Sequence, residues 1–312
     1  AVFASNLAGI LERAYQKPFK MKNILKARIL IDISAIYITD ARTGISRVVW
    51  QELNALIKVS HLPVHVVAYD NNLKSYKFVD EFILKAHGVA FKNCLDGEVI
   101  PQNGDIFYGL DFAVLYGDEK CELPVLQAYK NGFFDKLKKA GAKAYFRVYD
   151  LLPLTNPQFF PFNAARLHLS WLDTLKNINV HLIAISNRVY DDLMAFGIQN
   201  ASVVHLGSHF KISNSAKNKN KIKNFLMVGT IEERKAQKAV ALSFLRLASQ
   251  GIKARLIIAG RIGRVDDDFK KFLAECECGV DELLNFKDKE NNEILNETGT
   301  PKTPLVNEKR TN

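Results

Sequence analysis

The sequence predicts an α/β protein of two domains, each with a doubly wound parallel sheet, of which the second is incomplete. Three observations support this prediction. Short runs that are apolar on both faces alternate with helical patterns over most of the chain, as buried parallel strands and crossover helices do. A lysine-rich segment interrupts this alternation. The alternation restarts after the segment but ends early.

The first domain is predicted over residues 28–210. Its helical patterns cover residues 44–58 and 187–196, where apolar residues recur at intervals of three and four. Crossovers between parallel strands are right-handed, so one sheet covered by helices on both faces is expected. The strand candidates are the short runs rich in valine, isoleucine and aromatic residues at 28–34, 64–69, 105–110, 144–149, 181–186 and 202–206.

Residues 211–223 read KISNSAKNKNKIK and contain no acidic residue, which predicts a solvated linker. A partial second domain is predicted over 224–280, with helices at 235–249 and around 265–277. Its strand candidates are only 225–229 and 254–260.

The polar tail 281–312 offers no strand candidate that could finish the second sheet. A parallel sheet needs both faces and its edges covered. We therefore expect poor cover for the apolar residues of its two strands, namely Phe225, Leu226, Leu256, Ile257 and Ile258.

Composition narrows the class of protein. The chain has 312 residues, and 43 Lys and Arg against 33 Asp and Glu give a net charge of +10. This charge suits nucleic acid, an anionic membrane or a small anionic substrate. Nucleic acid is disfavoured because the lysines of 211–223 lack interleaved aromatic residues. Four cysteines exclude a disulfide scaffold and indicate a reducing, cytoplasmic setting. No apolar run approaches the roughly 18–20 residues of a transmembrane helix.

Residues 1–27 form a basic amphipathic segment. It predicts either a terminal helix packed on the fold or a surface helix at the anionic inner face of a membrane. The chain starts with Ala1 rather than Met, which indicates that it begins inside a longer one.

Common catalytic and cofactor signatures are missing from the sequence. It contains no P-loop, HExxH or GxSxG motif. The pair Gly260 and Gly263 lacks the spacing of a dinucleotide fingerprint, which disfavours a nicotinamide cofactor. The histidines do not fall at metal-ligand spacing, so we expect no metal site and no cofactor.

Three segments at predicted strand ends in the first domain are candidate ligand sites. Gly44 and Arg47 follow the first strand, where a glycine at a helix start lets backbone N–H groups approach an anion. Asp150 ends the fourth strand and could accept a hydroxyl hydrogen bond, or form a turn before Pro153. Ser186 ends the fifth strand and either caps the next helix or contacts a ligand.

Arg234 and Lys235 follow the first strand of the second domain, at the predicted start of a helix. Cations are unfavourable at that end of a helix dipole. Their presence is explained if a diphosphate neutralises them, with arginine as a fork and lysine as a point charge.

Several ordered segments make the sequence resemble a known family. The ordered segments are ILIDIS, RTGISRVVWQEL, GDIFYGLD, YDLLPLTNPQFF, IAISNRVYDDL, VVHLG and FLMVGTIEERKAQK. In order and spacing they are similar to family 4 glycosyltransferases, which are retaining enzymes of the GT-B fold with two Rossmann-like domains. The bacterial mannosyltransferase-like group, which acts in surface polysaccharide and lipopolysaccharide assembly, is the most similar. The resemblance covers roughly residues 28–280.

The resemblance implies roles at matching positions. Lys235, with Arg234 nearby, would contact the diphosphate of a nucleotide-sugar donor, and Gly44 and Arg47 would face the same phosphates. Asp150 would lie near the transferred sugar or the acceptor, which is a glycan or a lipid-linked glycan. The family has a histidine before this aspartate, where this chain has tyrosine, and Glu233 replaces the usual proline.

The family also carries a Glu–seven residues–Glu signature late in its second domain, and nothing in 281–312 matches it. Two hypotheses of different class follow. The first is a hexosyltransferase that transfers a sugar such as mannose from a nucleotide-sugar. The alternative is a truncated, catalytically inactive fragment that binds glycan or a partner protein.

The basic segment and the net charge of +10 generate a testable prediction. The chain should sediment with anionic vesicles at low salt and be released as salt is added. The Debye length shrinks from about 30 Å at 0.01 M to about 8 Å at 0.15 M ionic strength. Neutral vesicles are the control, and equal sedimentation with both kinds would contradict the prediction.

Overall fold

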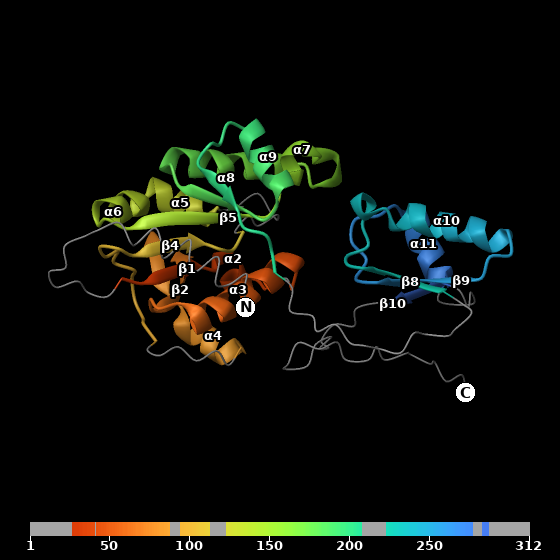
Figure 1. Cartoon of the computed structure of the whole chain (residues 1–312), viewed down its shortest axis with the longest axis horizontal. Coiled ribbons are helices and arrows are strands. Elements are labelled where there is room, and N and C mark those ends of the chain that lie inside the picture. The colour runs from red at the N-terminus through yellow and green to blue at the C-terminus, as the bar shows by residue number, and fades with distance from the viewer. Residues whose placement is uncertain are drawn as a thin grey trace. The chain divides into compact units, whose positions relative to one another are not determined.

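The computed structural model describes residues 27–40, 42–87, 94–112, 123–207, 223–276 and 283–286. They form two compact units, which divide between Lys211 and Ile212 (Figure 1). The amphipathic segment 1–27, apart from Ala27, lies outside the described residues, and so does the linker 211–223, apart from Lys223. Their predicted roles stay predictions.

Unit 1 contains a seven-stranded sheet in the order β3-β2-β1-β4-β5-β6-β7. All neighbours pair in parallel except β2 and β3. The α/β fold and the six predicted strands are confirmed. The strands are β1 (Ile29–Asp32), β2 (Val64–Asp70), β3 (Ser75–Phe78), β4 (Ile106–Gly109), β5 (Lys143–Val148), β6 (His181–Ala184) and β7 (Ala201–Val203).

Helices cover both faces of this sheet, as Figure 1 shows. On one face lie α3 (Gly44–Val59) and α4 (Asp80–His87). On the other face lie α5 (Pro124–Lys130), α6 (Phe133–Lys139), α8 (Ala164–Ile178) and α9 (Asn187–Ala195). The connections hold the short helices α2 (Ser34–Ile38) and α7 (Leu152–Thr155) and the 3-10 turn η1 (Pro157–Phe159).

Alternate residues of the central strands point to opposite faces of the sheet and belong to two separate hydrophobic cores. Ile29 and Ile31 of β1 pack toward α3 and α4, whereas Leu30 packs toward α5, α6 and α8. All three side chains are fully buried. Gly109 ends β4 beneath the ring of Phe146, where an added Cβ would lie 2.1 Å from a ring carbon. A glycine is therefore required for the two strands to pack at this point.

Strand β3 has no counterpart among the predicted strands. It pairs antiparallel with β2 through a tight hairpin. Asp70 accepts hydrogen bonds from the backbone N–H of Asn72 and Leu73, at 2.9 and 3.0 Å, and Lys74 adopts a left-handed φ of 53°. Four residues of mixed polarity are too few to reveal a strand by pattern, so only the turn chemistry could have indicated it.

Unit 2 contains a three-stranded parallel sheet in the order β10-β9-β8. Its strands are β8 (Lys223–Val228), β9 (Ala254–Ala259) and β10 (Leu283–Phe286). The helices α10 (Gln237–Ser249) and α11 (Asp267–Cys276) lie on the same face of the sheet (Figure 1). Leu256 and Ile258 of β9 pack against Ala241, Phe269 and Leu273 of these helices.

Two expectations for unit 2 are corrected. The tail 281–312 does supply a strand, since β10 pairs in parallel with β9; its other residues lie outside the described part of the chain. Leu256 and Ile258 are well covered, at 0% and 1% exposure. Phe225 and Leu226 of β8 are exposed as expected, at 48% and 63%.

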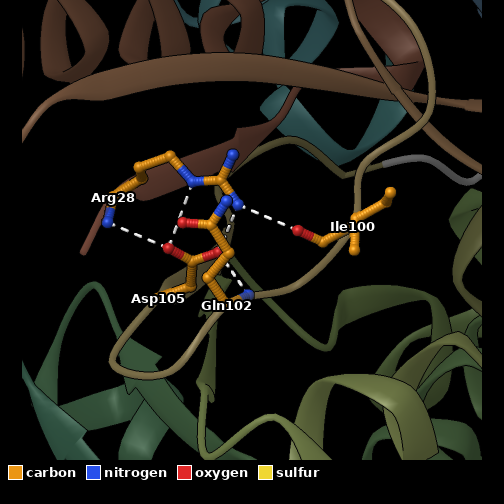
Figure 2. A network of polar contacts seen from close by, with 4 residues as sticks. All are labelled: Arg28, Ile100, Gln102 and Asp105. Carbon is orange, nitrogen blue, oxygen red and sulfur yellow. Dashed lines mark hydrogen bonds and ion pairs between the residues drawn. The ribbon is translucent and has the colours of Figure 1, made fainter. Parts of the chain in front are cut away.

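An ion-pair network joins the amino ends of β1 and β4 (Figure 2). The fully buried Asp105 carboxylate accepts from the Arg28 guanidinium through Nε at 3.2 Å and Nη2 at 2.7 Å. It also accepts from the backbone N–H of Arg28 and of Gln102, at 3.0 and 2.9 Å. Arg28 Nη2 donates further to the carbonyl of Ile100 at 3.0 Å. The Asp105 carboxylate thus holds the start of β1 against the loop that contains Ile100 and Gln102.

Arg28→Met should destabilise unit 1 by about 3 kcal/mol, because it leaves a buried carboxylate without its cation. Urea unfolding followed by tryptophan fluorescence measures this unit, since both tryptophans, Trp50 and Trp171, belong to it. Arg188→Met is the matched control, because its ion pair with Asp192 is solvent-exposed and should change stability by under about 0.5 kcal/mol. Equal effects of the two substitutions would contradict the assigned role of the network.

Candidate functional site

The carboxyl ends of the unit 1 strands bring several polar residues to one edge of the sheet. Strand order reverses between β1 and β4, since the chain adds β2 and β3 on one side of β1 and β4 on the other. Ligands of open α/β sheets bind outside the carboxyl ends of strands at such a reversal. Asp32 ends β1, Asp111 follows β4, Asp150 follows β5 and Ser186 follows β6.

Asp32 and Asp111 are two buried carboxyl groups at the reversal point. Asp32 accepts hydrogen bonds from the backbone N–H of Ser34 at 2.9 Å and from the Tyr76 hydroxyl at 3.0 Å. Asp111 accepts from the backbone N–H of Ile36 at 2.7 Å, and its own N–H donates to the Asp32 carbonyl at 3.1 Å. The two carboxyl groups therefore fix the loop that enters α2.

Burial raises the pKa of both groups, to about 6 for Asp32 and to about 7 for Asp111. Hydrogen bonds from Ser34 oppose the shift at Asp32, and the bond from Ile36 opposes it at Asp111. The negative charge of Asp32 adds to the shift at Asp111. This edge of the sheet therefore holds two carboxyl groups that bind or release protons between pH 5 and 8.

Asp150, the predicted catalytic residue, lies in the turn after β5. Its Oδ1 accepts from the backbone N–H of Leu152 at 3.1 Å, so the turn-forming interpretation applies. Its side chain remains partly exposed at the strand end. The structure does not test a catalytic role, which stays a prediction.

Tyr149 stands where the family that the sequence resembles has a histidine before the aspartate. It is buried, and its hydroxyl donates to the Leu110 carbonyl at 2.8 Å. Burial raises its pKa well above the ordinary value. A histidine does lie beside Asp150, because His168 of α8 places Nε2 3.2 Å from the Asp150 carbonyl oxygen. Burial lowers the pKa of His168 to about 4, so its ring is neutral at pH 7.

Gly44 and Arg47 lie in the first turn of α3. Thr43 and Ser46 form a reciprocal capping box, in which the Thr43 side chain accepts from the Ser46 N–H at 3.3 Å. Gly44 is exposed, and an added Cβ there would meet no atom within 4 Å. The surface at this helix start is therefore open. Arg47 is exposed on the same turn.

Ser186 caps α9, since its hydroxyl accepts from the Val189 N–H at 3.3 Å. The prediction that Ser186 caps the next helix is therefore confirmed. Contact with a ligand or acceptor stays a prediction.

The candidate anion site of unit 2 lies where β8 and β9 end. Gly229 and Gly260 have left-handed φ values of 129° and 155°. A Cβ on Gly260 would lie 2.1 Å from the Gly229 carbonyl oxygen, so the two backbones can approach this closely only with a glycine at position 260. Pairing continues beyond the strands through a parallel bridge between Ile231 and Ile262. Two loops therefore run side by side from these strand ends.

Arg234 and Lys235 come together over this turn, with Glu232 between them. Glu232 Oε1 lies 2.7 Å from Arg234 Nη2 and 3.4 Å from Lys235 Nζ. A Cβ on Gly229 would lie 3.0 Å from that same Nζ, so the bare glycine leaves the space that the ammonium group uses. About a third of each cationic side chain is exposed, at 32% and 33%.

The helix start predicted at 235 is wrong. Arg234 and Lys235 belong to the 3-10 turn η2 (Glu233–Lys235), and α10 begins at Gln237. Ala236 lies between η2 and α10 and has a left-handed φ of 56°, which separates the 3-10 turn from the helix. The helix-dipole explanation for the two cations therefore does not apply, because they precede the helix rather than forming its first turn.

Two features of these edges were not among the predicted site residues. Gln237 is buried at 3% exposure and joins the turn to α10: it accepts from the Glu232 N–H at 3.2 Å and donates to the Thr230 carbonyl at 3.0 Å. Asp32 and Asp111 form the second. Their signal was a lone aspartate at the end of each of two apolar runs, in ILID and FYGLD.

The described ranges contain neither a metal-ion cluster nor a membrane-spanning helix. No group of three or more His, Cys, Asp or Glu side chains there is arranged to hold a metal ion. Every helix in those same ranges is too short or too polar to cross a bilayer.

The fold and these edges define an α/β protein of two units, consistent with the Rossmann-like units of a GT-B glycosyltransferase. No protein-family model matches the chain. The chain is similar to three curated proteins of Escherichia coli, each described as serotype-specific mannosyltransferase WbdA. Each is 27% identical over 261 residues, which cover 76% of this chain.

This similarity confirms the predicted resemblance to bacterial mannosyltransferase-like proteins. The assignment to family 4 stays a prediction. The chain spans about 30% of the length of the curated relatives it matches.

The raised pKa of Asp111 predicts a pH-dependent stability of unit 1. With a pKa of about 7 when folded and an ordinary value of 3.8, Asp111 keeps a proton in the folded state that the unfolded chain has released. The free energy of unfolding contributed by this group therefore falls as pH rises from about 4 to 7. Asp111→Asn, which keeps an acceptor for Ile36, should gain stability relative to the wild type as pH rises from 5 to 8.

Urea unfolding at several pH values, followed by tryptophan fluorescence, measures this difference. Asp32 and His168 are present in both proteins, so their own contributions cancel, and the charge interaction between Asp32 and Asp111 is part of the difference that Asp111→Asn removes. Asp70→Asn is the control, since hydrogen bonding to Lys77 and to the backbone lowers the pKa of Asp70 and keeps it charged over this range. Parallel curves for Asp111→Asn and the wild type would show that Asp111 is not protonated in the folded unit.

Proposed function

We propose that the protein is a glycosyltransferase of the retaining GT-B type that acts in bacterial surface polysaccharide synthesis. It takes a hexose, with mannose the first candidate, from a nucleotide-sugar and transfers it to a glycan or lipid-linked acceptor. The observation that carries the proposal is the pair of cations over the glycine turn of unit 2, in a chain similar to mannosyltransferases over 76% of its length.

The chemistry follows from the charge on the leaving group. Transfer breaks the bond between the sugar and a nucleoside diphosphate, so negative charge grows on the phosphate oxygens. Arg234 and Lys235 can balance that charge, the arginine through paired N–H donors and the lysine as a point charge. In the front-face mechanism that we propose, the acceptor hydroxyl attacks from the face that the diphosphate leaves. The new glycosidic bond forms as the bond to the diphosphate breaks, and the hydroxyl proton passes to the departing phosphate oxygen.

Residues of unit 1 have proposed roles toward both substrates. Asp150 would accept a hydroxyl hydrogen bond from the acceptor or the transferred sugar, which suits its place at the carboxyl end of β5. Gly44 and Arg47 would offer backbone N–H groups and a guanidinium to the donor phosphates, as an exposed helix start allows.

Lys235→Ala should weaken binding of a nucleoside-diphosphate-mannose by about 1.5–3 kcal/mol, the value of a charge-assisted hydrogen bond. Calorimetry with a set of such donors that differ in the base measures the affinity. Lys238→Ala is the control: this lysine lies on the first turn of α10 but pairs with Asp266 at 2.9 Å. Unchanged affinity in Lys235→Ala, or an equal loss in Lys238→Ala, would reject the proposed donor site.

Release of nucleoside diphosphate in the presence of a mannan oligosaccharide tests transfer itself. Turnover that is lost in Lys235→Ala supports the proposed enzyme. Oligosaccharide binding without turnover supports the alternative, a binding protein that lacks catalytic activity.

A further inference from the structure

Glu232 forms ion pairs with both of the proposed phosphate-binding cations. Its Oε1 pairs with both Arg234 and Lys235. Its backbone is fixed on both sides, because its N–H donates to Gln237 and its carbonyl accepts from the Lys235 N–H at 2.9 Å. The carboxylate oxygen is therefore held between the cations by the same turn that positions them.

A carboxylate in this place resembles a phosphate oxygen in charge and in hydrogen-bond capacity. All three side chains remain partly open to solvent, with exposures of 23% for Glu232 and about a third for each cation. A diphosphate could reach the cations, but it would meet a negative charge already between them. An anionic ligand and the carboxylate compete for the same donors.

We propose that Glu232 is an internal counter-ion of the donor site, which the diphosphate displaces when it binds. The inference rests on the proposed function and adds to it a residue that sets affinity. Glu232 keeps the cations in position before the donor arrives, and its displacement costs part of the binding energy. Removing its charge should therefore strengthen binding of a diphosphate.

The test compares Glu232→Gln with Glu233→Gln in the full chain. Glutamine keeps the size and hydrogen-bonding atoms of glutamate but not its charge. Glu233 is the next residue, is exposed, and is not in the Glu232 ion pairs. Both variants thus change the net charge of the same turn equally, but only one removes the charge between the cations.

Calorimetry with inorganic diphosphate at low salt measures the affinity of each variant. We expect Glu232→Gln to bind about two- to fivefold more tightly than the wild type, the range for one partly exposed charge interaction. Glu233→Gln should bind less than about twofold more tightly. The affinity of Glu232→Gln for diphosphate should also fall more steeply with added salt than that of the wild type. The two cations then attract the diphosphate without a neighbouring carboxylate, and salt screens this stronger attraction.

Each outcome bears on the inference. Weaker or unchanged binding by Glu232→Gln, or equal tightening in both variants, overturns it. If the inference on Glu232 fails in this way but the wild type binds diphosphate and Lys235→Ala does not, the proposed donor site still stands. If no variant binds diphosphate, the donor site fails and the inference fails with it. Thermal unfolding of each variant verifies that it is folded.

Discussion

The arrangement of unit 1 depends on the seam between β1 and β4. The sheet changes its direction of growth there, so the strands on either side are connected through this one pair. Backbone pairing runs from Ile29 opposite Ile106 to Asp32 opposite Gly109. Carboxyl groups fasten both ends: Asp105 binds Arg28 at the amino end, and Asp111 binds the start of α2 at the other. The carboxyl edge of the sheet next to this seam is therefore tied to α2 by hydrogen bonds.

Unit 2 positions its cations by a different device, in which the backbone does most of the ordering. Gly260 lets the ends of β8 and β9 approach, Gly229 leaves room for the Lys235 ammonium group, and a left-handed Ala236 ends the 3-10 turn before α10 begins. Gln237 then ties the turn to the helix through two hydrogen bonds. The backbone that carries Arg234 and Lys235 is consequently fixed by hydrogen bonds on both sides of the turn.

Strands that carry a dense apolar run could be predicted from the sequence. Six strands of unit 1 and two of unit 2 have such runs, although β8 is largely exposed. β3 and β10 could not be predicted, because β3 reads SYKF, of mixed polarity, and β10 lies in a polar stretch and is defined by its pairing with β9. The grouping of Arg234 with Lys235 was visible from sequence, but the role of Glu232 between them was not. That role depends on the turn conformation, which the left-handed Ala236 sets and which no propensity of alanine predicts.

The left-handed alanine also constrains how this turn can vary among descendants of the sequence. Glycine, asparagine and aspartate adopt such a conformation readily, so they are acceptable replacements at position 236. Valine, isoleucine and threonine are branched at Cβ and would force the peptide back toward helical or extended geometry. A lineage that acquired one of them would lose the break before α10 and turn its two cations to new directions. Substitution at a residue without a functional group would thus alter the site as surely as loss of a charge.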